Sequence, residues 1–349
     1  MNESKTIAVD LAKDVFELVA ADAQWRIVER QRLTRTQLSR YFQNRMPVDV
    51  VMESCGTAHY WARTFEALGH TVRLLPSQYV RAYRRRNKTD RSDATAILEA
   101  ARSPEIKPVA VKNVEQQTIQ GLHRVRSQWM TTRTARINVI RGLLRELGYP
   151  LPVGSHIVRR KAPEVLEQLP APLRAAIEEL LEEIRSLEQR IHAIEDELER
   201  FARQNEAVET LREVPGIGLL TATALWAAAG SAAVFKSGRH LAAWLGLTPR
   251  EYSSGNQRHL GRISKRGDVY VRMLITHGAR SVLARAKQLH RSNKSLTRVQ
   301  RWAVQLEQRI GHNKATCALA NKLARIAWAL WRHHGSYDGA HVSQRAVTI

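Results

Sequence analysis

The chain has 349 residues and a formal net charge of +22, from 55 lysines and arginines against 33 aspartates and glutamates. This length predicts two or three domains, and the charge is typical of nucleic-acid binding, although a basic surface also fits an anionic membrane. Having only Cys55 and Cys317 excludes a disulfide framework and a zinc-ligand cluster, and no apolar run is long enough to span a membrane.

The first third of the sequence reads as alternating strands and helices. Apolar runs typical of strands occur at residues 6–9, 11–20, 25–33, 48–52 and 71–75. A helical pattern at 58–68 lies between the last two, so we expect a sheet flanked by helices over residues 1–105. Residues 1–5 lead into the first run without the apolar segment of a signal peptide, which predicts a cytoplasmic location.

Four acidic residues stand where a purely structural role is hard to assign. Asp10 and Glu53 each end an apolar run that reads as a strand, and Asp90 and Asp93 lie three apart at the start of a helical pattern. Gathered carboxylates are typical ligands of Mg²⁺, and two such ions can activate the attacking oxygen and stabilise the leaving oxygen at a phosphodiester. Taken singly, Asp10 also fits a turn and Asp90 a helix cap. As an ordered set, the four favour a metal site.

A basic segment at residues 79–88 separates the last predicted strand from the acid pair. It combines two tyrosines with five basic residues, which favours contact with nucleic acid by charge and stacking. The alternative is a solvated basic loop. The basic residues are Arg81, Arg84, Arg85, Arg86 and Lys88.

The middle of the chain, residues 106–205, is predicted to be helical. Residues 115–147 read as a long basic amphipathic helix, and prolines between 150 and 172 indicate a linker or irregular insertion. Over 177–201, apolar residues alternate spacings of three and four, which is a coiled-coil seam. The seam favours a homodimer, with packing inside the monomer as the alternative. Because residues 175–200 carry nine acidic residues against three arginines, the nucleic-acid surface is expected elsewhere.

The C-terminal part, residues 206–334, is predicted to be a helical domain, followed by a disordered tail at 335–349. Residues 211–222 resemble a helix-hairpin-helix element, in which Gly216 and Gly218 would expose backbone N–H groups to a phosphate. A plain helix junction is the alternative. Ser253 and Ser254 form a short polar turn, where local chemistry alone gives no reason to expect a nucleophile. The basic residues that follow are Arg258, Arg262, Lys265, Arg266 and Arg272.

Taken in order, these motifs resemble the DEDD transposases of bacterial insertion sequences, a group that includes bridge-RNA-guided recombinases. The resemblance spans about residues 5–333. It is carried by the following segments: 10–13, 53–54, 88–94, 214–218 and the block from Ser253 to Arg272. It implies a ribonuclease H-like domain similar to Holliday-junction resolvases, then a coiled-coil dimerisation segment, then an all-α C-terminal transposase domain.

The resemblance also implies roles for residues. The four carboxylates Asp10, Glu53, Asp90 and Asp93 would hold Mg²⁺, in a two-ion site that Mn²⁺ can also fill. Ser254 would be the nucleophile that links covalently to DNA, with Ser253 leaving the assignment open by one position. The serine of one protomer would complete the carboxylate site of another. The implied partners are donor and target DNA, a structured guide RNA, and further copies of the chain, dimeric through 177–201 and then tetrameric.

The sequence therefore predicts a site-specific DNA recombinase of an insertion sequence, acting on the nucleoid of a bacterial cell. The nearest alternative is a metal-dependent endonuclease of the junction-resolvase type that uses the carboxylates without the serine. An alternative of another class is a noncatalytic nucleic-acid scaffold, for which the basic helices suffice and the acidic residues are structural.

Overall fold

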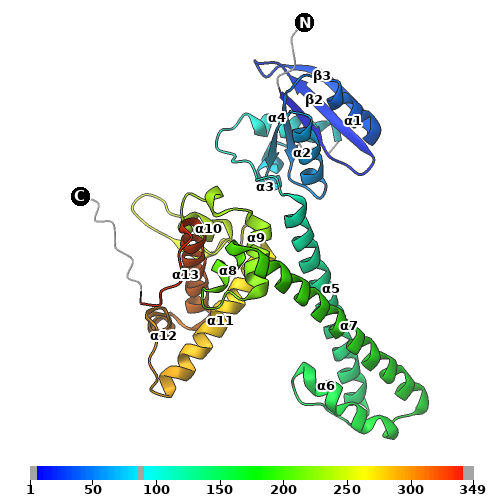
Figure 1. The fold of residues 1–349 in the computed structure, drawn as a ribbon, viewed down its shortest axis with the longest axis vertical. Helices are drawn as coiled ribbons and strands as arrows, with labels where there is room; N and C mark the ends of the chain where they lie inside the picture. The colour runs from blue at the N-terminus through cyan, green and yellow to red at the C-terminus, as the bar shows by residue number, and fades with distance from the viewer. Residues whose placement is uncertain (1–5, 85–89, 341–349) are drawn as a thin grey trace. The chain divides into compact units, whose positions relative to one another are not determined.

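The structure is a computed structural model that describes residues 6–84 and 90–340, with Asp90 and Arg91 described by their backbone alone. The chain divides into two compact units, Met1–Val114 and Glu115–Ile349, which we describe one at a time (Figure 1). The first unit contains the mixed α/β part and the second is mostly helical.

In the described part of the first unit, five strands form one sheet in the order β3-β2-β1-β4-β5. Their bounds are β1 (Thr6–Asp10), β2 (Val15–Ala21), β3 (Ile27–Thr34), β4 (Asp49–Glu53) and β5 (Thr71–Leu75). The strands β1, β2 and β3 pair antiparallel, whereas β4 pairs parallel with both β1 and β5. The predicted mixed α/β architecture is confirmed.

Alternation along the central strands divides the apolar side chains between two cores, because successive residues of a strand point to opposite faces. On one face Ile7 and Val9 pack with helices α1 (Arg35–Gln43) and α2 (Ala58–Ala67). On the other face Ala8 and Val51 pack with helix α4 (Asp90–Ala101). The short elements α3 (Ser77–Val80) and η1 (Arg81–Tyr83) follow β5. Helices therefore cover both faces of the sheet (Figure 1).

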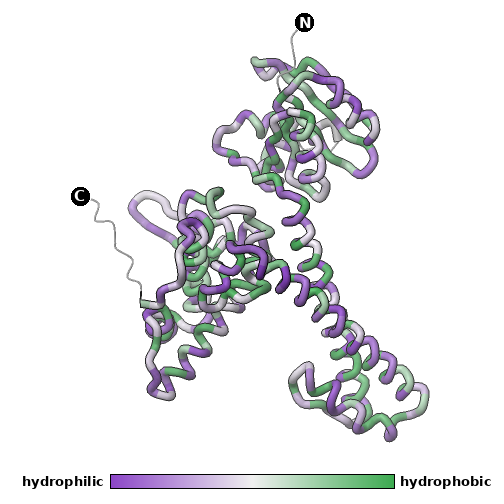
Figure 2. Tube along the Cα trace, viewed as in Figure 1, coloured by the Kyte–Doolittle hydropathy of each residue, from purple (hydrophilic) through white to green (hydrophobic). Residues whose placement is uncertain are grey.

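The second unit begins with a helical hairpin built from α5 (Val114–Glu146) and α7 (Ala171–Gln204). Hydrophilic and hydrophobic residues alternate along both helices in Figure 2, as an amphipathic pair requires. Ion pairs join Arg126 to Glu195, at 2.6 Å, and Arg136 to Glu183, also at 2.6 Å. Because the partner number falls as the arginine number rises, the two helices run antiparallel.

The coiled-coil seam of α7 is covered by α5 of the same chain. Ile177 and Ile184 are fully buried in one core with Ile140 of α5, and further along Ile194 and Leu198 share a core with Ile119. This is the alternative of packing inside the monomer, and it removes the apolar reason for a partner chain at this seam. The predicted spacing of three and four places Leu180 and Phe201 in the seam, but both are only partly buried. Leu181 and Ala202 are buried in their place.

The arginines of α5 are largely used inside this hairpin. Besides Arg126 and Arg136, Arg133 lies 3.7 Å from Glu188, and Arg141 donates to the backbone carbonyls of residues 151, 152 and 154. The acidic excess of α7 is thus matched by its neighbour. The basic character of α5 in the sequence overstates the positive surface that it offers to a nucleic acid.

The proline-containing stretch between α5 and α7 is folded, so of the two predicted alternatives it is an insertion and not a linker, with more regular structure than expected. It forms α6 (Ser155–Lys161) and the 3₁₀ helix η2 (Pro163–Gln168). Val158, Ala162 and Leu166 are buried against the end of the hairpin. Pro163 is tolerated because it stands in the first turn of η2, where its missing N–H would have no helical partner.

A helical domain follows α7 and surrounds one apolar core. Its elements are α8 (Glu206–Arg212), α9 (Leu219–Ala229), η3 (Ala232–Val234), α10 (Gly238–Trp244), α11 (Val269–Arg291), α12 (Arg298–Ile310) and α13 (His312–His333). A two-stranded hairpin, β6 (Pro249–Glu251) and β7 (Leu260–Ile263), interrupts them. Among the described residues, no helix is long and apolar enough to cross a membrane.

The tail predicted at 335–349 is described as far as residue 340. The backbone N–H of Tyr337 donates to Glu213 Oε2 at 2.7 Å, which ties this segment to the turn between α8 and α9. Residues 341–349 lie outside the described part of the chain.

Candidate active site and nucleic-acid contacts

Asp10 and Glu53 end two neighbouring parallel strands. The parallel register joins Val9 of β1 to Met52 of β4, so each acidic residue stands one position further along its strand. Asp10 shares a sheet face with Ala8, and Glu53 shares that face with Val51, because side chains two apart point the same way. Both carboxylates therefore lie on the face that α4 covers, and both are half-buried.

Asp93 reaches the same face from the first turn of α4. The helix is held against the sheet by apolar residues that include Ala94 and Ile97, and this packing leaves Asp93 only 5% exposed. Asp90 begins the helix, but its side chain lies outside the described residues. Three of the four predicted carboxylates are thus brought to one face of the sheet by three different elements.

A fifth acidic residue, which the sequence analysis did not select, belongs to this face. Glu17 of β2 stands directly opposite Asp10 in the antiparallel register, so both side chains point to the same side. Arg32 of β3 lies 3.5 Å from the Glu17 carboxylate. The predicted strand-turn-strand at residues 6–20 contained the signal, because pairing its two strands places Glu17 across from Asp10.

Arg84 lies between the carboxylates of Glu53 and Asp93. Its Nη2 donates to Glu53 Oε2 at 2.7 Å, and its Nε lies 3.4 Å from Asp93 Oδ1. The second contact is an ion pair without hydrogen-bond geometry. Both Arg84 Nε and Asp93 Oδ1 are buried and, among the described residues, have no hydrogen-bond partner. This arginine was predicted to bind nucleic acid, whereas here its guanidinium pairs with two carboxylates of the acidic cluster.

Among the described side chains, which do not include that of Asp90, no three His, Cys, Asp or Glu residues are arranged to hold a metal ion. Two of the predicted carboxylates, Glu53 and Asp93, instead contact the guanidinium of Arg84. The residues nevertheless fit a divalent cation. Asp93 Oδ1 is a buried carboxylate oxygen without a hydrogen bond, and hard divalent cations prefer oxygen ligands of this kind.

The serine pair lies in the connection between β6 and β7. The Ser253 hydroxyl donates to Glu251 Oε1 at 2.8 Å, and Arg258 Nε donates to the same oxygen at 3.1 Å. The hydrogen bond from Ser253, followed by the charge of Arg258, lowers the pKa of Glu251. Ser254 is exposed, and its backbone exchanges two hydrogen bonds with Gln257. In the described structure the Ser254 hydroxyl has no hydrogen-bond partner, so it is the freer of the two.

The base of this hairpin is pinned by close backbone contacts. Gly246 and Gly267 both have positive φ values, of 70° and 80°. A Cβ atom on Gly246 would come within 2.2 Å of the Arg266 carbonyl oxygen, and one on Gly267 within 1.8 Å of the Trp244 carbonyl oxygen. Only glycine permits this approach. The two feet of the hairpin are therefore held together.

Arg272 completes this fixation and does not face solvent. It is only 9% exposed, and its Nη1 donates to the carbonyl oxygens of Leu245 at 3.1 Å and Arg266 at 3.0 Å. The nucleic-acid contact predicted for Arg272 is therefore corrected to a structural role. The remaining basic residues of the block, Arg258, Arg262, Lys265 and Arg266, are exposed, as is Arg81 in the first unit. Arg85, Arg86 and Lys88 lie outside the described residues.

The predicted helix-hairpin-helix element corresponds to α8, a turn and α9. Gly216 has a φ of 86°, and a Cβ atom there would lie 2.8 Å from the Gly278 carbonyl oxygen of α11. Tight packing therefore accounts for Gly216. Gly218 is exposed and precedes α9 without a side-chain cap, so its position suits the predicted phosphate contact better.

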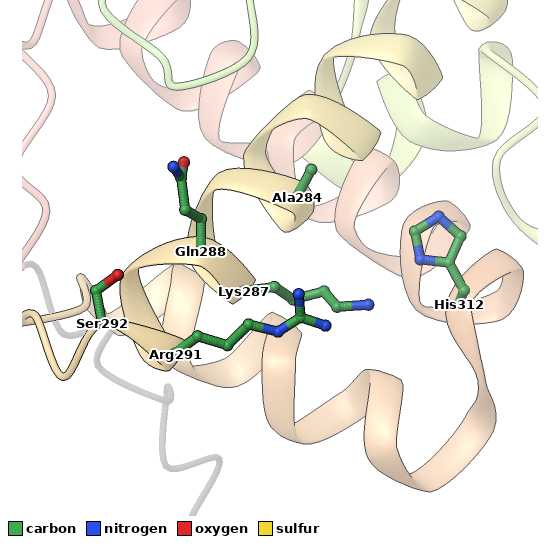
Figure 3. Close-up of a pocket in the computed structure, with 6 residues that line it drawn as sticks. All are labelled: Ala284, Lys287, Gln288, Arg291, Ser292 and His312. Carbon is green, nitrogen blue, oxygen red and sulfur yellow. The ribbon is translucent and has the colours of Figure 1, made fainter.

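A basic pocket that the sequence analysis did not find lies between α11 and α13. Figure 3 shows the head groups of Lys287 and Arg291 extending from α11 toward His312. The pocket has a volume of about 470 Å³, and Gln288 and Ser292 also line it. Glu307 accepts from Lys287 at 2.9 Å and from His312 at 2.8 Å. Within the described part of the chain Arg291 forms no ion pair, so its guanidinium can bind a phosphate.

The geometry defines two sets of groups suited to phosphodiester chemistry: a carboxylate cluster on an α/β sheet, and an exposed serine beside basic residues on a helical domain. The family model described as "Transposase" of the DEDD, IS110 group matches residues 7–149, and the one described as "Transposase IS116/IS110/IS902 family" matches residues 208–294.

Full-length relatives agree. A probable family 20 transposase of Pseudomonas aeruginosa is 43% identical over 345 residues, covering 97% of this chain and 99% of that protein. The transposase for insertion sequence element IS1111A of Coxiella burnetii is 38% identical, covering 97% and 92%. The transposase for element IS1328 of Yersinia enterocolitica is 36% identical, covering 93% and 96%. The chain belongs to the IS116/IS110/IS902 family of transposases, enzymes that cut and rejoin DNA, as the motif order predicted.

Proposed function

We propose that this transposase is a site-specific recombinase of an insertion sequence, in which a carboxylate site and a serine nucleophile act together on DNA. The observation that carries the proposal is the gathering of Asp10, Glu53 and Asp93 on one face of the sheet by β1, β4 and α4. The mixed sheet with helices on both faces supports a ribonuclease H-like fold for this unit.

Asp10, Glu53 and Asp93 would hold divalent cations, together with Asp90, for which the described part of the structure gives only the backbone. The expected site holds two Mg²⁺ ions, which Mn²⁺ can replace. When bound, the ions would polarise the scissile phosphate as Lewis acids. The three described carboxylates come from separate rigid elements, so their spacing is set by the packing of α4 on the sheet rather than by a loop.

Ser254 is proposed as the nucleophile. Its Oγ forms a bond to phosphorus while the bond from phosphorus to one deoxyribose oxygen breaks, and that oxygen leaves with a proton. The hydroxyl proton of Ser254 passes to solvent. Attack by a sugar hydroxyl of the second DNA then restores a phosphodiester and releases the serine, so no external energy source is needed. The free hydroxyl of Ser254 supports this role over Ser253, whose hydroxyl is bound to Glu251.

Sequence choice is proposed to come from an element-encoded structured RNA that pairs with donor and target DNA, while the protein binds backbone and shape. The exposed basic residues around the serine and the pocket of Lys287 and Arg291 would supply such contacts. Assembly as a dimer and then a tetramer on nucleoid DNA in the cytoplasm completes the proposal. Because α5 covers the seam at 177–201, the dimer contact there would use the outer surface of the hairpin.

The test is a covalent-adduct assay. Purified protein is incubated with Mg²⁺, donor and target DNA, and RNA transcribed from the element's flank, and is then run on a denaturing gel. We expect a protein–DNA adduct that Ser254→Ala and Asp93→Asn lose and that Ser253→Ala, the matched control, keeps. Mg²⁺-dependent nicking without any adduct would favour the resolvase-type endonuclease. An adduct that forms equally without RNA would refute the guidance, and full activity of Asp10→Asn would favour a noncatalytic scaffold.

A further inference from the structure

Arg84 is placed as a cation within the acidic cluster. Its side chain is 27% exposed, against 16% for Glu53 and 8% for Asp93, so the three charges lie largely out of water. A carboxylate in such a place is costly unless it is paired, and two near each other also repel. The guanidinium therefore stabilises the domain by compensating both carboxylates at once.

The compensation is incomplete in a specific way. Arg84 hydrogen-bonds Glu53, but its Nε and the facing Asp93 Oδ1 stand 3.4 Å apart without a hydrogen bond. Asp93 is thus attracted by the positive charge of Arg84 but lacks the hydrogen bond that usually accompanies a buried ion pair. Asp93 Oδ1 can therefore still act as a ligand of a divalent cation, which would attract it more strongly than the guanidinium does.

We propose that Arg84 is a tethered counter-cation that occupies the acidic cluster until a divalent cation binds, and that it leaves Glu53 and Asp93 when this happens. The inference rests on the metal site of the proposed function. Two cations cannot share these oxygens without strong repulsion, so Arg84 and the metal compete. Arg84 thereby keeps the apo domain folded and lowers its affinity for the metal. Once displaced, its guanidinium is free to pair with a phosphate of the bound strand.

The competition predicts opposite effects of one substitution. Arg84→Gln removes the charge and keeps much of the side-chain length, so Mn²⁺ should bind about tenfold more tightly, because one nearby positive charge is gone. The same variant should unfold at a lower temperature in EDTA, since Glu53 and Asp93 then lack their cation. Arg84→Lys keeps the charge and should bind Mn²⁺ within about twofold of wild type.

The experiment uses full-length protein without nucleic acid. Free Mn²⁺ is measured by electron paramagnetic resonance during a titration, and the unfolding temperature is measured in EDTA. The matched control is Arg81→Gln, a nearby exposed arginine whose side chain has no ion pair among the described residues; neither measurement should change. If Arg84→Gln does not fold in EDTA, the proposal requires that Mn²⁺ restore its folding, and failure to do so would overturn it.

Asp93→Asn separates the two levels of the proposal. If Asp93→Asn binds Mn²⁺ as tightly as wild type does, the assignment of the metal site is wrong, and the proposed competition between Arg84 and the metal is refuted with it. If Asp93→Asn weakens Mn²⁺ binding while Arg84→Gln binds no more tightly than wild type, only the competition is refuted. Weaker binding by Asp93→Asn together with tighter binding by Arg84→Gln would support both.

Discussion

Replacing Arg272 by methionine should loosen the serine hairpin without removing a nucleic-acid contact. Methionine preserves much of the apolar stem but none of the donors that hold the carbonyl oxygens of Leu245 and Arg266. A hydrogen bond to a charged group contributes about 1.5–3 kcal/mol, so two give roughly 3–6 kcal/mol. The lower end of this range applies, because the hydrogen bond to the Arg266 carbonyl is only partly buried, so water can replace this partner. We therefore expect a loss of about 3 kcal/mol.

The assay is urea unfolding by circular dichroism, combined with amide hydrogen exchange. Exchange should accelerate at residues 246–248 and 264–267, the two feet of the hairpin, where Lys265 N–H donates to the Gly246 carbonyl. The matched control is Arg262→Met on exposed β7, which should change stability by less than about 0.5 kcal/mol. Unchanged stability and exchange in Arg272→Met, together with weaker DNA binding, would refute the structural role and restore the contact predicted from sequence.

Three further outcomes follow from other parts of the molecule. Ile184→Ala should lower the free energy of unfolding by about 2–5 kcal/mol at every protein concentration, because the side chain is buried within one chain. If the decrease in the unfolding midpoint varied with protein concentration, the seam would instead belong to a dimer. Burial lowers the pKa of His123 to about 4, below the value of 6.5 in an unfolded chain. The unfolded state therefore takes up a proton first as the pH falls. The free energy of unfolding should decrease between about pH 6.5 and pH 4, by at most about 1.4 kcal/mol per pH unit. Thermal melts across this range should show a flatter dependence for His123→Gln, and identical curves would contradict the assignment. Arg291→Ala should reduce the slope of log affinity against log salt concentration by the equivalent of about one phosphate contact, measured by fluorescence anisotropy with DNA and with RNA. An unchanged slope for both nucleic acids would exclude the pocket as a phosphate-binding site.

The elements of the first unit could be predicted because their pattern is local. Apolar runs gave β1, β4 and β5 nearly to the residue, and strand ends located Asp10 and Glu53. What a periodic pattern does not contain is the identity of the surface that covers it. The seam of α7 has the spacing of a dimeric coiled coil, yet arginines and apolar residues of α5 meet it from the same chain.

The basic residues show the same limit at the level of single side chains. Sequence composition treats Arg84, Arg262 and Arg272 alike as candidates for phosphate contact. Their surroundings differ: Arg84 meets carboxylates, Arg272 meets two backbone carbonyls, and Arg262 stays exposed. These partners are distant in sequence or belong to the main chain, so no local sequence pattern predicts them. The hairpin of β6 and β7 was also missed, because exposed strands lack the alternation that marks a buried one.

The contact between Gly216 and Gly278 has a consequence for how copies of such an element decay in a genome. A Cβ atom on Gly278 would lie 1.8 Å from the Gly216 carbonyl oxygen, and one on Gly216 would lie 2.8 Å from the Gly278 carbonyl oxygen. Neither position can compensate for a change at the other, since each needs the absence of a side chain. A duplicated copy that has acquired any substitution at either glycine is therefore expected to encode a misfolded transposase, and to persist only as a relic unless an intact copy supplies the protein.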